Sequence, residues 1–154
     1  MNLPNHCPPP LNRRHALRLA WATALAAGSV RASPVPAMKL LLKLGDHRLD
    51  LLLDDHPTAR DFAALLPLRL SLEDYAATEK IAVLPRALTT EGAPAGYAPM
   101  AGDMAYYAPW GNVALFHKDF QHSPGLVRLG RLTQGVQRLA MPGRVVAEWT
   151  LAAP

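Results

Sequence analysis

The sequence predicts a mainly β domain, folded as a closed barrel or a sandwich of about eight short strands with one or two short helices. Three observations support this fold class. Apolar and polar residues alternate in short runs over most of residues 38–151. Gly- and Pro-containing turns separate these runs at short intervals. The clearest helical pattern is only about two turns long.

The first elements are a hairpin and a short helix. Residues 38–53 hold two extended runs around the turn residues Gly45-Asp46, which predicts a β-hairpin. Residues 58–66 predict a helix, in which Thr58 and Asp61 have the spacing of a capping box. A proline directly follows, and we expect it to end the helix. We expect this helix to cover an open side of the sheet.

The middle of the chain predicts a strand, a long loop and a second hairpin. Residues 68–72 alternate strictly, as in a half-buried strand, whereas residues 73–87 have a mixed pattern. Thr89–Gly102 contains two glycines and two prolines between its ends, so we predict a long loop that serves as a lid or a binding loop. Residues 104–116 predict a hairpin around the turn at 109–112.

The last third predicts a polar loop at 117–125, a strand at 126–132, one helical turn at 134–139 and a final strand at 144–151. The sequence contains no internal repeat, no P-loop and no dinucleotide-binding fingerprint. One face of the final strand is expected to carry Val145, Ala147, Trp149 and Leu151.

The N-terminal segment 1–32 has the pattern of a twin-arginine export signal. Arg13 and Arg14 precede an apolar, Ala-rich stretch at 19–28, which is too short to span a bilayer and has the length of a signal h-region. We therefore expect a periplasmic protein with no stable membrane anchor.

Two small-residue cleavage sites follow the apolar stretch, and we favour cleavage after Ala32 over cleavage after Ala37. Residues 33–37 are then a linker and residues 38–154 the folded domain. The alternative is that Met38 is the true start, which would leave the protein in the cytoplasm.

The excess positive charge lies in the predicted signal. Four of the 16 Lys and Arg residues fall within residues 1–32, and all 12 Asp and Glu residues follow it. The remaining domain is formally neutral, without a basic run, so we expect no nucleic-acid partner. Cys7 is the only cysteine. Its removal would leave no thiol for a disulfide, a metal site or a nucleophile, and we expect no cofactor.

Six stretches, in this order and spacing, resemble the small bacterial cyclophilin-like domains, a family without a firmly assigned activity. The resemblance implies an eight-stranded barrel closed by a short helix. It covers nearly all of the chain after residue 37, through residues 57–62, 73–75, 78–81, 90–92, 102–116 and 126–131.

The resemblance does not imply prolyl isomerase activity. Isomerising cyclophilins use an arginine in an F-H-R-type motif above a hydrophobic proline pocket, and this sequence has no such motif. Ala114 stands near the position expected for the family's glutamine. We therefore predict a non-catalytic or weakly catalytic domain that binds a small molecule or an extended peptide. The alternatives are a prolyl isomerase and a structural or interaction module.

The candidate binding residues are mostly aromatic. Aromatic residues make up only 6% of the chain, yet several cluster within residues 106–116. We predict that they form a ligand groove; the alternative is that they pack in the core and around a turn. Tyr106 and Tyr107 should face opposite sides of a strand, so only one can point into the barrel. The groove candidates are Tyr106, Tyr107, Trp110, Asn112, Phe116 and Glu79. We expect the loop Thr89–Gly102 to lie over this groove.

Two other polar groups have weaker patterns. Glu79 and Lys80, near Tyr75, are either an acid–base pair or, more ordinarily, a solvent-facing pair. His117, Asp119 and His122 are residue types that bind zinc, but their spacing matches no known metal motif, so we predict no metal site. Ser123 lacks the sequence context of a hydrolase nucleophile.

Overall fold

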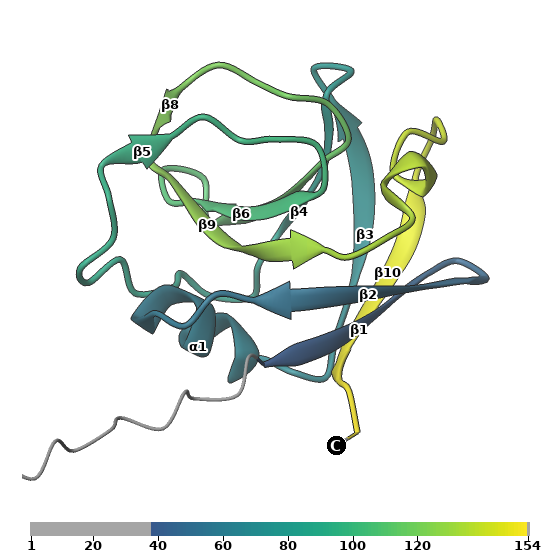
Figure 1. Cartoon of the computed structure of the whole chain (residues 1–154), viewed down its shortest axis with the longest axis horizontal. Helices are drawn as coiled ribbons and strands as arrows, with labels where there is room; N and C mark the ends of the chain where they lie inside the picture. Colours follow the sequence, from purple (N-terminus) through teal and green to yellow (C-terminus); the bar gives the residue numbers. More distant parts are fainter. Residues whose placement is uncertain (1–37, 154) are drawn as a thin grey trace, which may run out of the picture. The chain divides into compact units, whose positions relative to one another are not determined.

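The computed structural model describes residues 38–153, which form the barrel domain drawn in colour in Figure 1. The predicted export signal and linker lie outside these residues. Within residues 38–153, no helix has the length and apolar character that crossing a membrane requires.

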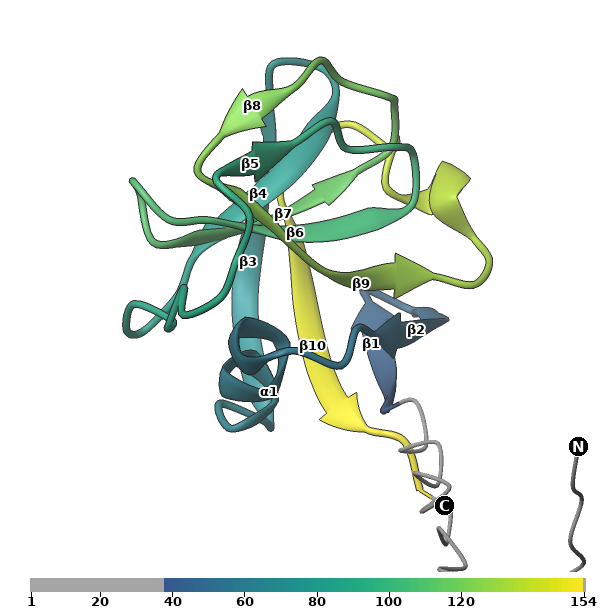
Figure 2. The same cartoon turned by 60° about the vertical axis from the view of Figure 1, so that its left-hand side comes forward.

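Eight strands of the described region form a closed, antiparallel barrel, as the sequence predicts (Figures 1 and 2). Their order around the barrel is β1 (Lys39–Leu44), β10 (Val145–Leu151), β3 (Leu68–Tyr75), β4 (Glu79–Val83), β7 (Asn112–Phe116), β6 (Asp103–Tyr107), β9 (Leu126–Leu132) and β2 (His47–Leu53). Both predicted hairpins are present, as the β1–β2 and β6–β7 pairs.

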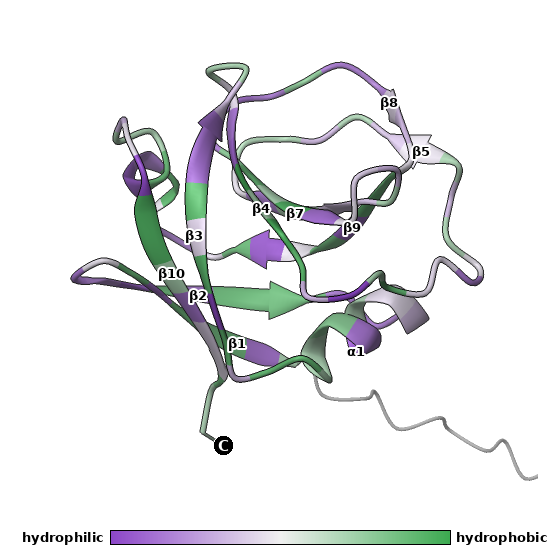
Figure 3. Ribbon diagram, turned by 180° about the vertical axis from the view of Figure 1, so that it is seen from behind, coloured by the Kyte–Doolittle hydropathy of each residue, from purple (hydrophilic) through white to green (hydrophobic). Residues whose placement is uncertain are grey.

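The interior of the barrel is filled by one face of each strand. Burial alternates residue by residue along β1, and Figure 3 shows hydrophobic and hydrophilic positions alternating in the first part of β3, which is the pattern of strands with one buried face. Leu40 and Leu42 of β1 are completely buried, and Trp149 of β10 is the largest buried side chain. Leu151 ends β10 largely exposed, so the predicted inward face stops at Trp149.

Helix α1 (Pro57–Ala63) packs against the barrel through Phe62, whose ring meets the edge of Trp149 at a centroid distance of 6.2 Å. The predicted capping box is wrong. His56 is the N-cap, with an extended backbone, and its Nδ1 accepts a hydrogen bond from the amide of Ala59. Thr58 is already inside the helix and is buried, so it cannot act as a cap.

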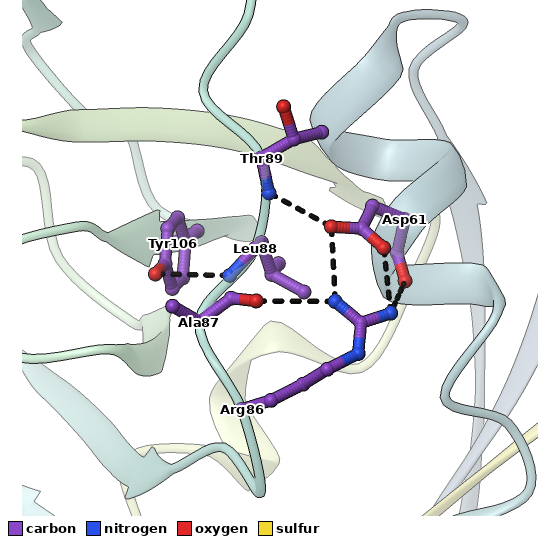
Figure 4. Close-up of polar contacts among 6 residues, drawn as sticks. All are labelled: Asp61, Arg86, Ala87, Leu88, Thr89 and Tyr106. Carbon is purple, nitrogen blue, oxygen red and sulfur yellow. Dashed lines mark hydrogen bonds and ion pairs between the residues drawn. The ribbon is translucent and has the colours of Figure 1, made fainter.

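Asp61, the other residue of the predicted capping box, instead fastens the segment after β4 to α1 (Figure 4). Its carboxylate accepts hydrogen bonds from both terminal nitrogens of Arg86, at 2.6 and 3.1 Å, and from the amide of Thr89, at 2.8 Å. The hydrogen bond from Arg86 is the main cause that lowers the pKa of Asp61. The amide of the preceding residue, Leu88, donates to the hydroxyl of Tyr106 at 3.1 Å.

The long loop Thr89–Gly102 is held in place by strand pairing. It contains β5 (Gly96–Tyr97), which pairs with β8 (Ser123–Pro124) to form a two-stranded sheet. A Cβ at Gly96 would lie 2.4 Å from the carbonyl oxygen of Ser123, so this pairing requires glycine there. The predicted turn at 134–139 is a short 3₁₀ helix, η1 (Val136–Arg138).

Candidate functional site

A groove of about 310 Å³ lies on the outside of the barrel, across β4, β7 and β6. The alternation of β7 places it there: Val113 and Leu115 point into the core, so Asn112, Ala114 and Phe116 point to the opposite face. We call this site the aromatic groove. Its lining residues are Tyr75, Ala76, Glu79, Ile81, Tyr107, Trp110, Asn112, Ala114, Phe116, Phe120, Gln121, Ser123 and Leu126.

Aromatic rings form both ends of the aromatic groove. At one end Trp110, 53% exposed on the β6–β7 turn, meets Tyr75 and Tyr107 edge to face, at centroid distances of 5.5 and 5.4 Å. At the other end Phe116 stacks on Phe120 at 6.4 Å. These geometries are favourable for aromatic pairs, and the exposed rings of Trp110 and Tyr75 remain available to a ligand.

The floor between the rings is apolar. Ala114 and Phe116 belong to a small buried cluster, separate from the barrel core, against which Ile81 packs. The small side chain at position 114 keeps the middle of the aromatic groove open. This arrangement suits an apolar or planar group lying across β7.

Two polar side chains in the aromatic groove have unusual surroundings. Glu79 is half-buried, and burial raises the pKa of its carboxyl, although a 2.6 Å hydrogen bond from the hydroxyl of Thr78 opposes this shift. Asn112 is only 2% exposed, and its Nδ2 donates to the carbonyl of Val113 at 3.3 Å. The Oδ1 atom of Asn112 has no hydrogen-bond partner among the described residues.

Five of the six groove candidates line this site, namely Glu79, Tyr107, Trp110, Asn112 and Phe116. Tyr106 does not. It is 1% exposed in the barrel core, where its hydroxyl accepts a hydrogen bond from the amide of Leu88. Adjacent strand residues face opposite sides, so only Tyr107 reaches the aromatic groove.

The prediction that the loop Thr89–Gly102 covers the aromatic groove is wrong. Thr89–Gly102 contributes no lining residue; Phe120, Gln121 and Ser123 of the polar loop 117–125 do so instead. Tyr75 and Phe120 were also missed as site residues. Their signal in the sequence was weak, because each is a single aromatic residue in a polar stretch.

Both interpretations of the Glu79–Lys80 pair are wrong. Lys80 is completely buried on the inner face of β4, opposite to Glu79. Its Nζ donates to the carboxylate of Asp74 and, at 2.8 Å, to the carbonyl of Gly143. The hydrogen bond from Lys80, followed by one from the amide of Gly143, lowers the pKa of Asp74. Lys80 is therefore a structural cross-link between strands and a distant loop.

The His117, Asp119 and His122 side chains are not gathered into one site. Asp119 accepts a hydrogen bond from the amide of Ala101 at 2.8 Å, and His122 is exposed. Burial, and then the charge of Lys118, lowers the pKa of His117. Within residues 38–153, no three His, Cys, Asp or Glu side chains are grouped closely enough to hold a metal ion.

Comparisons with known proteins agree with this architecture. A sequence model of the cyclophilin-like family matches residues 42–149. The solution structure of a hypothetical protein from Archaeoglobus fulgidus superposes with a TM-score of 0.55, covering 75% of this chain and 95% of that protein, at 17% identity. This likeness shows the fold alone. No curated protein matches the chain.

Proposed function

The chain belongs to the cyclophilin-like family, and we propose that its barrel is a binding domain that holds a small molecule or an extended peptide in the aromatic groove. The observation that carries this proposal is a built site on the outside of a closed barrel. Aromatic rings stand at both ends of the site, and the buried Oδ1 of Asn112 lacks a partner among the described residues.

The size and composition of the aromatic groove support ligand binding. Its volume of about 310 Å³ is within the range of small-molecule sites. A buried acceptor without a hydrogen bond costs about 1–3 kcal/mol, and a ligand donor that reached Asn112 Oδ1 would recover this energy. Trp110 is too exposed to be explained as a core residue.

The positions of the polar groups indicate an elongated ligand. Glu79 pairs in register with Phe116, four residues along β7 from Asn112. At about 3.3 Å per residue, the two polar ends of the aromatic groove are about 13 Å apart along the strand. A matching ligand has polar groups at both ends and an apolar middle that lies over Ala114.

The test uses a variant that fills the aromatic groove. Ala114→Phe should block the floor, whereas Val146→Phe places the same ring on β10, outside the lining residues. We expect proline-containing peptides and a panel of elongated amides to shift the Trp110 indole NMR signal of the wild-type chain. Ala114→Phe should weaken the response at least about tenfold, while Val146→Phe should retain it. No response to any ligand, or an equal response in Ala114→Phe, would overturn the proposal.

Prolyl isomerisation is less well supported than binding. Among the described residues, no Arg or Lys lines the aromatic groove, so no cationic donor is placed to stabilise a twisted X–Pro amide. We expect a protease-coupled assay on X–Pro peptides to give the uncatalysed rate. A clear acceleration that Ala114→Phe abolishes would instead assign isomerase activity to this site.

We further propose that the domain acts after export by the twin-arginine route. Fractionation of cells that express the full chain tests this. The Arg13→Lys/Arg14→Lys double variant should stay in the cytoplasm, while Arg18→Lys, which leaves the pair intact, should be exported. Cytoplasmic wild-type protein that begins at Met38 would show that Met38 is the start.

A further inference from the structure

A second cavity, of about 360 Å³, lies beneath the loop Thr89–Gly102. We call it the loop pocket. One side is formed by the loop residues Pro94, Tyr97 and Met100, and the other by β9 and the segment before α1. It shares no lining residue with the aromatic groove.

The charged groups around the loop pocket are already paired. Arg128 makes two hydrogen bonds to Asp54, at 2.7 and 3.1 Å. His56 uses both ring nitrogens, with Nε2 2.7 Å from the carbonyl of Arg128 and Nδ1 accepting from the amide of Ala59. Oδ1 of Asp103 lies 3.7 Å from Nη1 of Arg131, an ion pair that balances its charge but is too long for a hydrogen bond. A ligand of this pocket therefore meets no uncompensated charge. The ligand itself needs no charge in order to bind there.

Two buried polar atoms of the loop pocket lack hydrogen-bond partners within residues 38–153: the hydroxyl of Tyr97 and Oδ1 of Asp103. Asp103 is only 2% exposed, and its other oxygen accepts from the amide of Met100 at 2.9 Å. Such atoms are uncommon in native proteins, and each one calls for a partner.

We propose that the loop pocket binds a neutral small molecule whose hydroxyl or primary amide accepts a hydrogen bond from Tyr97 and donates one to Asp103. A hydroxyl or primary amide has both functions. The apolar part of the ligand packs against Pro94, Met100 and Val127. Burial, reinforced by the charge of Asp103, raises the pKa of Tyr97, so its hydroxyl keeps the proton that it donates.

The experiment titrates the full chain with benzyl alcohol, benzamide and toluene, and follows the backbone amides of Ala98, Met100 and Val127 by NMR. Toluene is the matched control without a polar group. We expect saturable shifts with the first two probes and at least tenfold weaker binding of toluene. Tyr97→Phe should weaken the polar probes about tenfold without lowering the melting temperature, because the lost hydroxyl has no described protein partner.

Two further variants locate the binding. Ala93→Phe, which fills the loop pocket, should abolish the shifts, and Trp110→Ala, which removes the ring at the exposed end of the aromatic groove, should leave them intact. The proposal is overturned if toluene binds equally well, if Tyr97→Phe melts lower or binds unchanged, or if the shifts vanish in Trp110→Ala. It is also overturned if millimolar probes cause no shift, the result expected where an ordered water satisfies both atoms.

Discussion

Glu79 and Lys80, the first two residues of β4, show how strongly one position along a strand changes a side chain's surroundings. Glu79 points outward into the aromatic groove, whereas Lys80 points inward and is completely buried. Lys80 has two hydrogen-bond acceptors and Glu79 has one donor, the hydroxyl of Thr78. Two carboxyl groups, Glu79 itself and Asp74 beside Lys80, therefore affect the pH dependence of stability through different causes.

Glu79 should destabilise the fold as the pH rises. Burial raises the pKa of Glu79 above its ordinary value of 4.5. A raised pKa contributes stability below the unfolded value, and this contribution is lost as the pH rises through the folded value. From about pH 4 to about pH 7, the free energy of unfolding of the wild type should therefore fall relative to that of Glu79→Gln. Urea unfolding measures this, with Glu91→Gln in the exposed loop as control; parallel profiles for wild type and Glu79→Gln would contradict it.

Asp74 should have the opposite effect at acid pH. Its pKa lies below the ordinary value of 3.8, chiefly because of the hydrogen bond from Lys80. The stability it contributes is present above 3.8 and is lost as the pH falls through the folded value. Lys80→Met should reduce this loss of stability at acid pH, while Lys43→Met, which removes an exposed ion pair with Glu148, should not. If Lys80→Met lost as much stability at acid pH as the wild type does, the Gly143 amide alone would set the pKa of Asp74.

At the scale of elements, the turn between β3 and β4 contains stored strain. Ala76 and Ala77 have positive φ values of 49° and 54°, a left-handed conformation that costs L-residues about 1–2 kcal/mol each. Ala77→Gly should raise the free energy of unfolding by about 1 kcal/mol, less the entropy that glycine adds to the unfolded chain. Ala64→Gly, at an ordinary helical φ of −69°, should instead lower it by about 0.5–1 kcal/mol. Chemical denaturation distinguishes the two, and a loss of stability in Ala77→Gly would contradict the strain.

Elements whose pattern is local could be predicted from the sequence. The alternation in residues 104–116 predicts the β6–β7 hairpin and the opposite orientations of Tyr106 and Tyr107. This alternation, together with the Gly and Pro turns, also predicts a barrel or a sandwich, and the resemblance to the cyclophilin-like family implies the barrel. Four of the five candidate residues that line the aromatic groove lie in the same hairpin, so the alternation also predicts most of these candidates.

Features that depend on distant partners could not be predicted. Lys80 is buried because it reaches Gly143, 63 residues away. The loop Thr89–Gly102 does not cover the aromatic groove, because β5 pairs with β8 and holds the loop above a different cavity. Thr58 failed as a cap because His56 takes that role, and histidine is not among the residues usually preferred there.

At the scale of the whole domain, the fold and the candidate site use different faces of the same strands. The last strand, β10, closes the barrel between β1 and β3, and its Trp149 packs in the core against Phe62. The aromatic groove lies outside this core, on β4, β6 and β7, with Trp110 at its exposed end. A ligand site can therefore vary without disturbing the interior that stabilises the domain.

The two tryptophans of residues 38–153 separate these functions experimentally. Trp149→Ala removes the largest buried side chain and should lower the free energy of unfolding by about 3–5 kcal/mol, a large part of a typical domain's stability. Trp110→Ala removes a ring that is 53% exposed and should cost less than about 1 kcal/mol, while it abolishes binding in the aromatic groove. Denaturant titration and ligand titration of both variants measure the difference. If Trp110→Ala instead costs several kcal/mol and no ligand binds the wild type, the aromatic residues brace the β6–β7 turn, and the domain is a structural module.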